Sequence, residues 1–394
     1  MKNFFKAIGY ILFFAAVAVL SYIGIRFIRS VGNIKKDIEI RDSYVLSGSF
    51  YYQLNEQERE IYDGMIESLR SGSNTYKIAS LKKSEFSDTL SRVITAVEYD
   101  HPELFWVRGG YTTVYTRTPT DCYVDIDVTL SCYQFWEYSS DPQRYYDALM
   151  RKVDEVAALA SNLETDYEKA VFFYEYLAKN TEYDYERLAE AQKTVHPASS
   201  ELIYTPYACL VEGKAVCSGY SKAYKLLLNR CGINCYYVTG KAGGPHGWNC
   251  VELDGEYYHV DVTWGDGKFT RSDGTVWADT VNYEYCCVTE KDITVNHTVD
   301  ESKFDYPYCK AVKYDYCVYN GYLKDVFTKE SAAAVLAGQN DKNPAILRFT
   351  TYGEYKNACD YMSGKSTAKE FRSNFGYDIG LVFKDEKYMI LAVH

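Results

Sequence analysis

The chain has 394 residues, enough for two or three domains, and 47% of them are hydrophobic, enough for buried cores. The net charge of −11 provides no basic surface for nucleic acid, so we expect no nucleic-acid partner. The 12 cysteines show no regular spacing and therefore predict no disulfide framework. The 41 tyrosines would suit a groove that binds a sugar or peptide chain, although compositional bias explains them equally well.

The first element is an uncharged, apolar run over residues 7–25. As a helix it would be about 28 Å long, which matches the hydrocarbon thickness of a bilayer. A secretory signal peptide cleaved near Ala16-Val17-Ala18 is the alternative, but the apolar run continues beyond those residues. We expect a retained single-pass transmembrane anchor over residues 1–30, with the bulk of the chain outside the cell, and a tether over residues 31–50.

Residues 51–160 predict an N-terminal α+β region. Asn55 and Glu58 form a capping-box pattern at the start of an amphipathic helix. Apolar and polar residues alternate from Cys122 to Cys132, which is typical of a half-buried antiparallel strand. Pro142 begins another predicted helix. One face of that helix carries Tyr146, Leu149, Val153, Val156 and Ala160.

A second capping-box pattern, Thr165 with Glu168, begins the helix that leads into the central part of the chain. Residues 188–207 show no periodicity and precede the candidate nucleophile, so this loop is a candidate lining for a substrate cleft. Tyr207 is a candidate substrate-binding residue there, and packing in the core is the alternative.

Cys217 opens the most informative helix of the chain. Apolar residues follow at helical spacing, and Gly232 is a helix stop. Cys217 therefore falls in the first turn, where unpaired N–H groups and the helix dipole favour a thiolate and could hold an oxyanion. A buried structural cysteine is the alternative for any single cysteine.

A hairpin follows, because Asp254-Gly255 between two strand-like runs is a strong turn signal. With these two residues as the turn, Trp248 faces Asp261, and His246 becomes the diagonal neighbour of Asp261 on the same face. Diagonal positions lie about 7–8 Å apart at the backbone, within reach of a His–carboxylate hydrogen bond. A thiol nucleophile, a base and an orienting carboxylate are thus predicted as Cys217, His246 and Asp261. A surface ion pair is the alternative for the last two.

His259 shares a face with Asp261 and would lie opposite Cys250, which gives a second thiol–imidazole pair. Both lie in mid-strand without a helix dipole, so we rank them below Cys217 and His246. Cys231 and Cys235 have no second pair at the spacing of a zinc site. We expect no metal site and no cofactor.

The central stretch resembles the bacterial form of the transglutaminase-like superfamily. The matching segments are Gly213–Tyr220, His246–Asn249 and Tyr257–Trp264. In that family a helix-borne Cys with a His and an Asp on adjacent strands forms a papain-like triad, which implies Cys217, His246 and Asp261 here. Gly247 and Gly265 depart from the usual residues of the family without touching the triad. The resemblance implies acyl transfer from an amide, either to an amine or to water.

The remaining elements predict a surface loop over residues 265–274 and strands over residues 280–318. A C-terminal α+β module over residues 301–394 is expected, with no catalytic constellation. Its expected elements after the first strand are a helix over 328–337, a strand over 345–350, a helix over 352–362 and a hairpin of 381–383 with 388–393.

The fold class expected is α+β, with a papain-like or transglutaminase-like core over residues 161–300 in which the cysteine helix packs on an antiparallel sheet. We expect a cysteine acyltransferase or peptidase in the cell envelope that acts on peptide or protein substrates. Trp248, next to the expected base, is a second candidate substrate-binding residue. The alternative is a non-catalytic envelope binding or scaffold protein that has kept the fold.

Overall fold

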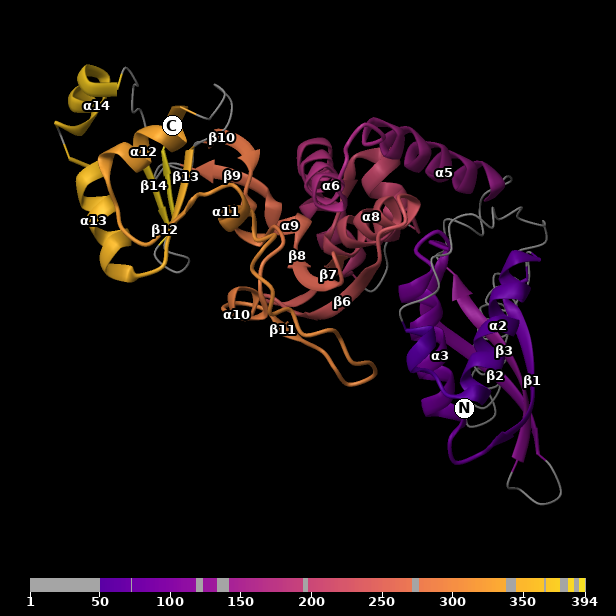
Figure 1. Cartoon of the computed structure of the whole chain (residues 1–394). Coiled ribbons are helices and arrows are strands. Elements are labelled where there is room, and N and C mark those ends of the chain that lie inside the picture. Colours follow the sequence, from indigo (N-terminus) through magenta and orange to yellow (C-terminus); the bar gives the residue numbers. More distant parts are fainter. Residues whose placement is uncertain are drawn as a thin grey trace, which may run out of the picture.

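The computed structural model describes residues 50–71, 73–117, 123–132, 142–193, 198–270, 276–337, 345–364, 366–375, 382–385 and 390–393. The predicted anchor over residues 1–30 and the tether up to residue 49 lie outside these residues. Among the helices that are described, none combines the length and apolar character needed to span a membrane. The described part forms three units in a row, with the N-terminal unit at one end and the C-terminal unit at the other (Figure 1).

The N-terminal unit is a three-stranded antiparallel sheet, in the order β1-β3-β2, that packs with two helices. Its elements are η2 (Tyr51–Gln53), α2 (Glu56–Arg70), β1 (Thr75–Lys82), α3 (Phe86–Asp100), β2 (Val107–Arg117) and β3 (Tyr123–Cys132). The capping box predicted at Asn55 and Glu58 is present. The alternation predicted for β3 is also present in the described residues, because Ile126, Val128 and Leu130 are buried between exposed neighbours such as Asp127.

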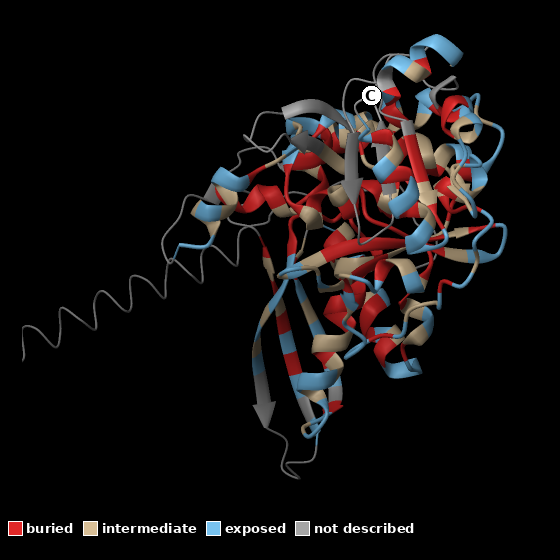
Figure 2. Cartoon of the chain, turned by 90° about the vertical axis from the view of Figure 1, so that its left-hand side faces the viewer, coloured by how far each residue is buried: buried red, intermediate tan, exposed pale blue. Residues whose placement is uncertain are grey.

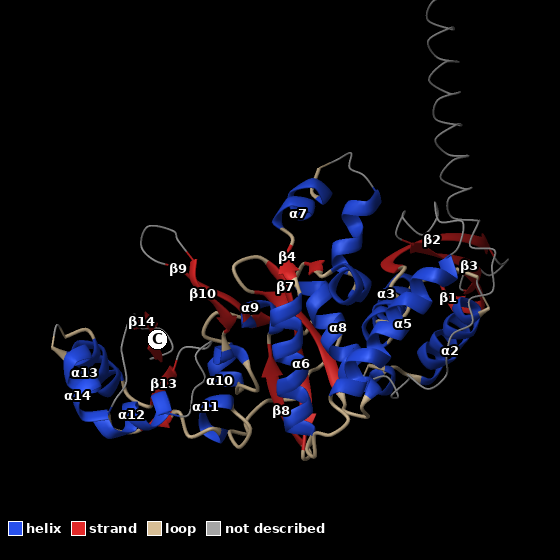
Figure 3. Ribbon diagram, turned by 90° about the horizontal axis from the view of Figure 1, so that it is seen from above, coloured by secondary structure: helices blue, strands red, loops and turns tan. Residues whose placement is uncertain are grey.

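The central unit is built on a four-stranded antiparallel sheet in the order β11-β6-β7-β8. Helix α8 packs on β6 and β7, and α6 packs on α8 (Figure 3). The helices and turns of the unit are α5 (Pro142–Leu159), α6 (Asp166–Asn180), α7 (Tyr185–Ala191), η3 (Ala198–Tyr204), η4 (Ala208–Glu212), α8 (Cys217–Arg230), α9 (Val262–Gly265), η5 (Tyr283–Tyr285) and α10 (Glu290–Ile293). Its strands are β4 (Glu182–Tyr183), β5 (Lys214–Ala215), β6 (Cys235–Lys241), β7 (Pro245–Leu253), β8 (Glu256–Val260), β9 (Asp266–Thr270), β10 (Val276–Val281) and β11 (Thr298–Val299).

The hairpin of β7 and β8 has the predicted register. Both turn residues have positive φ, 53° at Asp254 and 77° at Gly255, as a type I′ turn requires. Pairing runs from Leu253 opposite Glu256 to Asn249 opposite Val260. Strand β8 ends at Val260, so the prediction that Asp261 lies on the strand is wrong. Its side chain accepts hydrogen bonds from the backbone of α9, and this capping turns the chain into a helix.

The segment after α9 also differs from expectation in two places. Over the described part of the expected surface loop, Asp266–Thr270 is strand β9 and pairs with β10 (Val276–Val281), and residues 271–275 lie outside the described residues. Of the strands expected over residues 280–318, the structure has the end of β10 and the short strand β11, whereas most of the range forms short helical turns and irregular segments. The physical reason is capping, because the side chains of Asn282, Thr289 and Asp315 each accept a hydrogen bond from a backbone N–H and start a helical turn.

The C-terminal unit follows α11 (Tyr316–Tyr319) and contains a mixed sheet in the order β12-β13-β15-β14. Its elements are β12 (Leu323–Lys324), α12 (Lys329–Ala337), β13 (Ala345–Phe349), α13 (Tyr352–Met362), α14 (Thr367–Phe375), β14 (Val382–Asp385) and β15 (Ile390–Val393). The predicted elements are present, and α14 was not predicted. The unit has its own hydrophobic cluster, centred on Leu347, Phe349 and Phe371.

The N-terminal and central units share one hydrophobic core, and the buried residues run continuously through both (Figure 2). Helix α5, which the expected boundary at residue 160 assigned to the N-terminal region, packs on α8 of the central unit. A partly buried ion pair reinforces the junction, since Lys222 Nζ of α8 lies 2.9 Å from Glu98 Oε1 of α3. Helix α8 is therefore held in place both by α5 and by α3 of the N-terminal unit.

Candidate active site

Cys217 is the first residue of α8 and is half-buried. The preceding Val216 has an extended backbone (φ −108°, ψ 178°), so the helix begins abruptly at the cysteine. The helix ends near Gly232, whose φ of 80° marks the stop that the sequence predicted. The sulfur therefore lies at the positive end of a 14-residue helix, where an anion is favoured.

Polar side chains fix this end of α8 against the strand that carries His246. The Ser221 hydroxyl lies 2.8 Å from the Cys217 carbonyl oxygen and 2.7 Å from the Gly247 carbonyl oxygen. The Asn249 side-chain amide donates to the Ser221 carbonyl oxygen over 3.0 Å. These bonds join the first turn of α8 to the strand that carries His246.

The predicted contact between His246 and Asp261 is present, with Nε2 of the ring 2.7 Å from Oδ2 of the carboxylate. The Cys217 sulfur lies close enough to this ring to contribute to its pKa. Burial alone would lower the pKa of His246, but the charge and hydrogen bond of Asp261, together with the Cys217 contact, raise it to about 10. Both ring nitrogens of His246 therefore carry a hydrogen at neutral pH, and the ring is positively charged.

Asp261 is fully buried and accepts four hydrogen bonds. The backbone N–H groups of Thr263 and Trp264 bond to Oδ1, and the rings of His246 and His297 bond to Oδ2. Burial by itself would raise the pKa of Asp261, but His246 and His297 hold it well below its usual range. The carboxylate is therefore ionised and held in one orientation.

His297 is a site residue that the sequence analysis missed. Its Nε2 lies 3.0 Å from Asp261 Oδ2, and its Nδ1 lies 2.5 Å from Asn296 Oδ1. The residue is 36 positions from Asp261 along the chain and belongs to none of the motifs above. Only its type, one of six histidines, could have drawn attention to it.

Trp248, the second residue predicted to bind substrate, is fully buried. Its ring stacks on the ring of His246, with centroids 6.1 Å apart and planes inclined by 20°. The indole therefore supports the histidine from behind and limits the rotation of the imidazole.

The structure places Tyr207 in an aromatic cluster, where its ring stacks at 5.7 Å on Phe105 and lies 5.3 Å from Tyr145. These contacts account for its partial burial as packing. Tyr183 and Tyr204 lie near the cysteine instead. Burial, followed by the neighbouring Cys217 sulfur, raises the pKa of both hydroxyl groups. Tyr204 is the last residue of η3, within the segment that the sequence predicted to line a cleft, and that lining stays a prediction.

The competing pair Cys250 and His259 lies opposite across the hairpin, as predicted. Both side chains are buried, and His259 Nε2 bonds to Glu290 Oε2 over 2.9 Å. The pair therefore belongs to a separate cluster behind Trp248, without the half-exposed position of Cys217.

His246, Asp261 and His297 also have the side-chain types of a metal site, with their ligand atoms within 4.8 Å of one another. Both imidazole rings donate directly to the same carboxylate oxygen, at 2.7 and 3.0 Å. Since each Nε2 uses its hydrogen in this way, it has no lone pair to offer a cation, and the geometry is that of a hydrogen-bonded triad extended by a second histidine.

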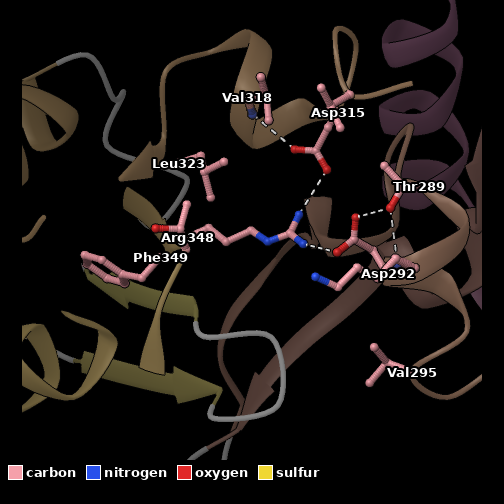
Figure 4. Close-up of a pocket in the computed structure, with 11 residues that line it drawn as sticks. Thr289, Asp292, Val295, Asp315, Val318, Leu323, Arg348 and Phe349 are labelled. Carbon is pink, nitrogen blue, oxygen red and sulfur yellow. Dashed lines mark hydrogen bonds and ion pairs between the residues drawn. The ribbon is translucent and has the colours of Figure 1, made fainter. Parts of the chain in front are cut away.

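A pocket of about 410 Å³ lies at the junction of the central and C-terminal units (Figure 4). Arg348 points into it and pairs with Asp292 and Asp315. Cys217, His246 and Asp261 are not among its lining residues, so this pocket is separate from the candidate active site.

Comparison with known proteins bears on the central unit. Residues 155–262 match the model of the transglutaminase-like superfamily. The kyphoscoliosis peptidases of Homo sapiens and Mus musculus are 28% and 26% identical to this chain over 125 residues. Each alignment covers 28% of this chain and only 18% of the relative.

Solved structures with partial similarity include a TGase, which is 19% identical with a TM-score of 0.28 and covers 41% of this chain and 46% of its own. A proposed cysteine protease of Cytophaga hutchinsonii is 14% identical with a TM-score of 0.22, over 39% of this chain and 62% of its own. These TM-scores are too low to carry an argument. The family match spans α6, α8 and the β7–β8 hairpin, the elements that bring Cys217, His246 and Asp261 together. This chain therefore carries a domain of the transglutaminase-like superfamily.

Proposed function

We propose that the protein is a cysteine enzyme that transfers or hydrolyses acyl groups at peptide or protein amides. Cys217 is the nucleophile, His246 is the general base and acid, and Asp261 orients and charges the histidine. The observation that carries the proposal is a half-buried thiol at a helix N-terminus, beside an imidazole whose Nε2 lies 2.7 Å from a buried carboxylate. The family match supports a peptide or protein substrate.

The steps follow from the positions of these groups. His246 already holds the proton of the thiol, because its ring is protonated at neutral pH, and the Cys217 sulfur attacks the amide carbonyl carbon. The N–H groups at the start of α8 face the oxyanion that develops. His246 then gives its proton to the leaving nitrogen, and an acyl-thioester remains on Cys217. Water or a second amine, deprotonated by His246, attacks the thioester and restores the thiol.

The test is the alkylation rate of each cysteine with iodoacetamide, followed by peptide mass spectrometry. Cys231 is the matched control, because it is a half-buried thiol at the opposite end of the same helix. At neutral pH we expect Cys217 to react at least about tenfold faster than Cys231, because thiolate reactivity follows the local electrostatic environment. We expect His246→Ala to abolish this difference. Equal rates for Cys217 in both proteins would refute the proposal.

A second test separates enzyme from binding protein. A library of peptide amides is incubated with the full chain and with Cys217→Ser, and released ammonia or amine is measured. Product from the full chain alone supports catalysis. Peptide capture by both proteins without product would favour the alternative of a non-catalytic binding or scaffold protein.

The cellular location is also a proposal, which rests on the sequence of residues 1–30. We infer a single-pass anchor that keeps the bulk of the chain on the outer side of the cell membrane. Membrane fractionation of the full chain and of a chain without residues 1–30 tests this. A full chain that remains in the soluble fraction would contradict it.

A further inference from the structure

A second group of thiol, imidazole and carboxylate side chains lies behind the candidate active site. Cys250 lies in the middle of β7, and Cys309 lies in the irregular segment that follows β11. Both residues are fully buried, and their sulfur atoms lie 3.4 Å apart. His259 and Glu290 complete the group, with His259 Nε2 2.9 Å from Glu290 Oε2.

The hydrogen bonds of His259 argue against a cation in this cluster. The Trp248 indole N–H donates to His259 Nδ1 over 3.1 Å, so Nδ1 carries the lone pair and Nε2 carries the hydrogen. A cation bound by Nε2 would require the lone pair there and would force an N–H at Nδ1 against the indole N–H. The ligand atoms of His259, Glu290 and Cys309 lie within 4.8 Å of one another. They are nevertheless arranged to hydrogen-bond with one another and with Trp248, and not to share a cation.

The two sulfur atoms differ in their protonation. Burial and the neighbouring Cys309 raise the pKa of the Cys250 thiol, which therefore keeps its hydrogen. The hydrogen bond from Cys250 lowers the pKa of Cys309. A thiol that donates to a neighbouring thiolate is the arrangement that thiol–disulfide exchange uses.

We propose that Cys250 and Cys309 form a disulfide, closed during folding by exchange with a small disulfide such as oxidised glutathione. The Cys309 thiolate attacks one glutathione sulfur, and the other leaves as a thiolate. The Cys250 sulfur, whose proton passes to that leaving thiolate, then attacks the Cys309 sulfur of the mixed disulfide and expels the second glutathione. Two cysteine thiols lose two electrons, and one glutathione disulfide becomes two glutathione thiols.

The bond would enclose the chain from residue 250 to residue 309, which includes Asp261 and His297. It would thereby join β7, the strand of His246, to the end of the segment that carries the other two members of the histidine–aspartate group. The inference stands on the sulfur positions and is independent of any enzymatic activity.

The experiment uses the full chain with Cys217→Ala, so that the reactive thiol of the active site takes no part. The protein is unfolded with reductant, refolded in a buffer of reduced and oxidised glutathione, denatured again and alkylated. Peptide mass spectrometry then measures alkylation of each cysteine. Cys317 is the matched control, because it is equally buried but burial beside Asp315 raises its pKa.

We expect alkylation of Cys250 and Cys309 to be lost, alkylation of Cys317 to be retained, and a joined peptide pair to appear whose mass is lower by two hydrogen atoms. Prior reduction should restore both thiols. In Cys309→Ser, alkylation of Cys250 should return. Full alkylation of Cys250 and Cys309 without reduction would overturn the proposal. Stoichiometric zinc in the refolded protein, lost in Cys309→Ser, would overturn it as well.

Discussion

Asp261 is the residue on which the charges of the candidate site depend, because it is fully buried and two imidazole rings donate to one of its oxygens. An ionised carboxylate in such a position is stable only while its partners supply positive charge or hydrogen bonds. The stability of the folded chain should therefore follow the protonation of His246.

The first prediction concerns this dependence. The ordinary pKa of His246 is 6.5, and in the folded chain it is about 10. Below pH 6.5 the histidine is protonated in both the folded and the unfolded chain, and the stabilisation is complete. Between the two values only the folded state holds the proton, so the free energy of unfolding should fall with rising pH, by up to about 1.4 kcal/mol per pH unit. The stabilisation is lost above about pH 10.

Urea unfolding across this pH range measures the slope, and Asp261→Asn is the matched control because it keeps the size of the side chain without its charge. The slope should be much smaller in Asp261→Asn. Equal slopes in the two proteins would show that His246 does not draw its proton affinity from Asp261.

At the acid end, Asp261 itself should cause a loss of stability as the pH falls below 3.8, its ordinary pKa.

The second prediction concerns His297. The change His297→Phe keeps a ring among Trp248, Trp264 and Tyr285 but removes the donor to Asp261. We expect a loss of about 1–3 kcal/mol in the free energy of unfolding, the usual cost of a buried acceptor without its partner. His297→Gln, which keeps a donor, should recover part of it.

The alkylation rate of Cys217 distinguishes positioning from structural support. If His297 positions Asp261, folded His297→Phe should alkylate more slowly than the unaltered chain, and His297→Gln should lie between them. If His297 only supports the structure, His297→Phe would lower the free energy of unfolding but leave the alkylation rate of Cys217 in the folded protein unchanged.

At the scale of elements, the position of the nucleophile depends on how closely α8 approaches the segment before it. A side chain at Gly219 would place its Cβ 2.7 Å from Ala215 Cβ and 2.8 Å from the Ile203 carbonyl oxygen. Glycine therefore lets the first turn of α8 lie directly on this backbone, which sets the depth of Cys217.

The third prediction concerns the close contact at Gly219. Gly219→Ala should destabilise the fold by about 1–3 kcal/mol, because the helix must move away from fixed backbone atoms. It should also slow alkylation of Cys217. Gly353→Ala is the control: Gly353 lies in α13 with nothing within 4 Å of the added Cβ, so the change should be neutral or stabilising. Thermal unfolding of both variants measures the difference, and equal melting temperatures would contradict the prediction.

At the scale of the molecule, Arg348 joins the C-terminal unit to the central one. It lies on β13, its Nη1 is 3.0 Å from Asp315 Oδ2, and its Nη2 pairs with Asp292 Oδ1 (Figure 4). Asp315 is buried and also caps α11, so its carboxylate depends on this cation.

The fourth prediction is that Arg348→Met lowers the free energy of unfolding by about 3 kcal/mol, because removing one partner of a buried pair leaves an uncompensated charge. Limited proteolysis should release the C-terminal unit sooner. Lys329→Met is the control, since the Lys329–Glu370 pair lies at the surface and within one unit. A surface pair contributes about 0–1 kcal/mol. Similar behaviour of the two variants would show that Arg348 does not hold the units together.

Much of this protein is determined by sequence features that act over a few residues. The capping boxes at Asn55 and Thr165, the glycine after α8 and the Asp254-Gly255 turn each specify a local backbone conformation, so these elements lie where the sequence predicts them. The hairpin register also predicted the contact of His246 with Asp261, because a two-residue turn fixes which residues lie opposite.

Other features were decided only by the tertiary structure. The contact of His297 with Asp261, the approach of Cys309 to Cys250 and the pair of Arg348 with Asp315 join residues 33 to 59 positions apart. Such contacts depend on how whole elements pack, and a histidine or cysteine that makes one has the same local sequence pattern as one that does not. Local preferences act through the backbone of neighbouring residues, whereas the surroundings of a buried charge are set by chain segments that meet only in the folded protein.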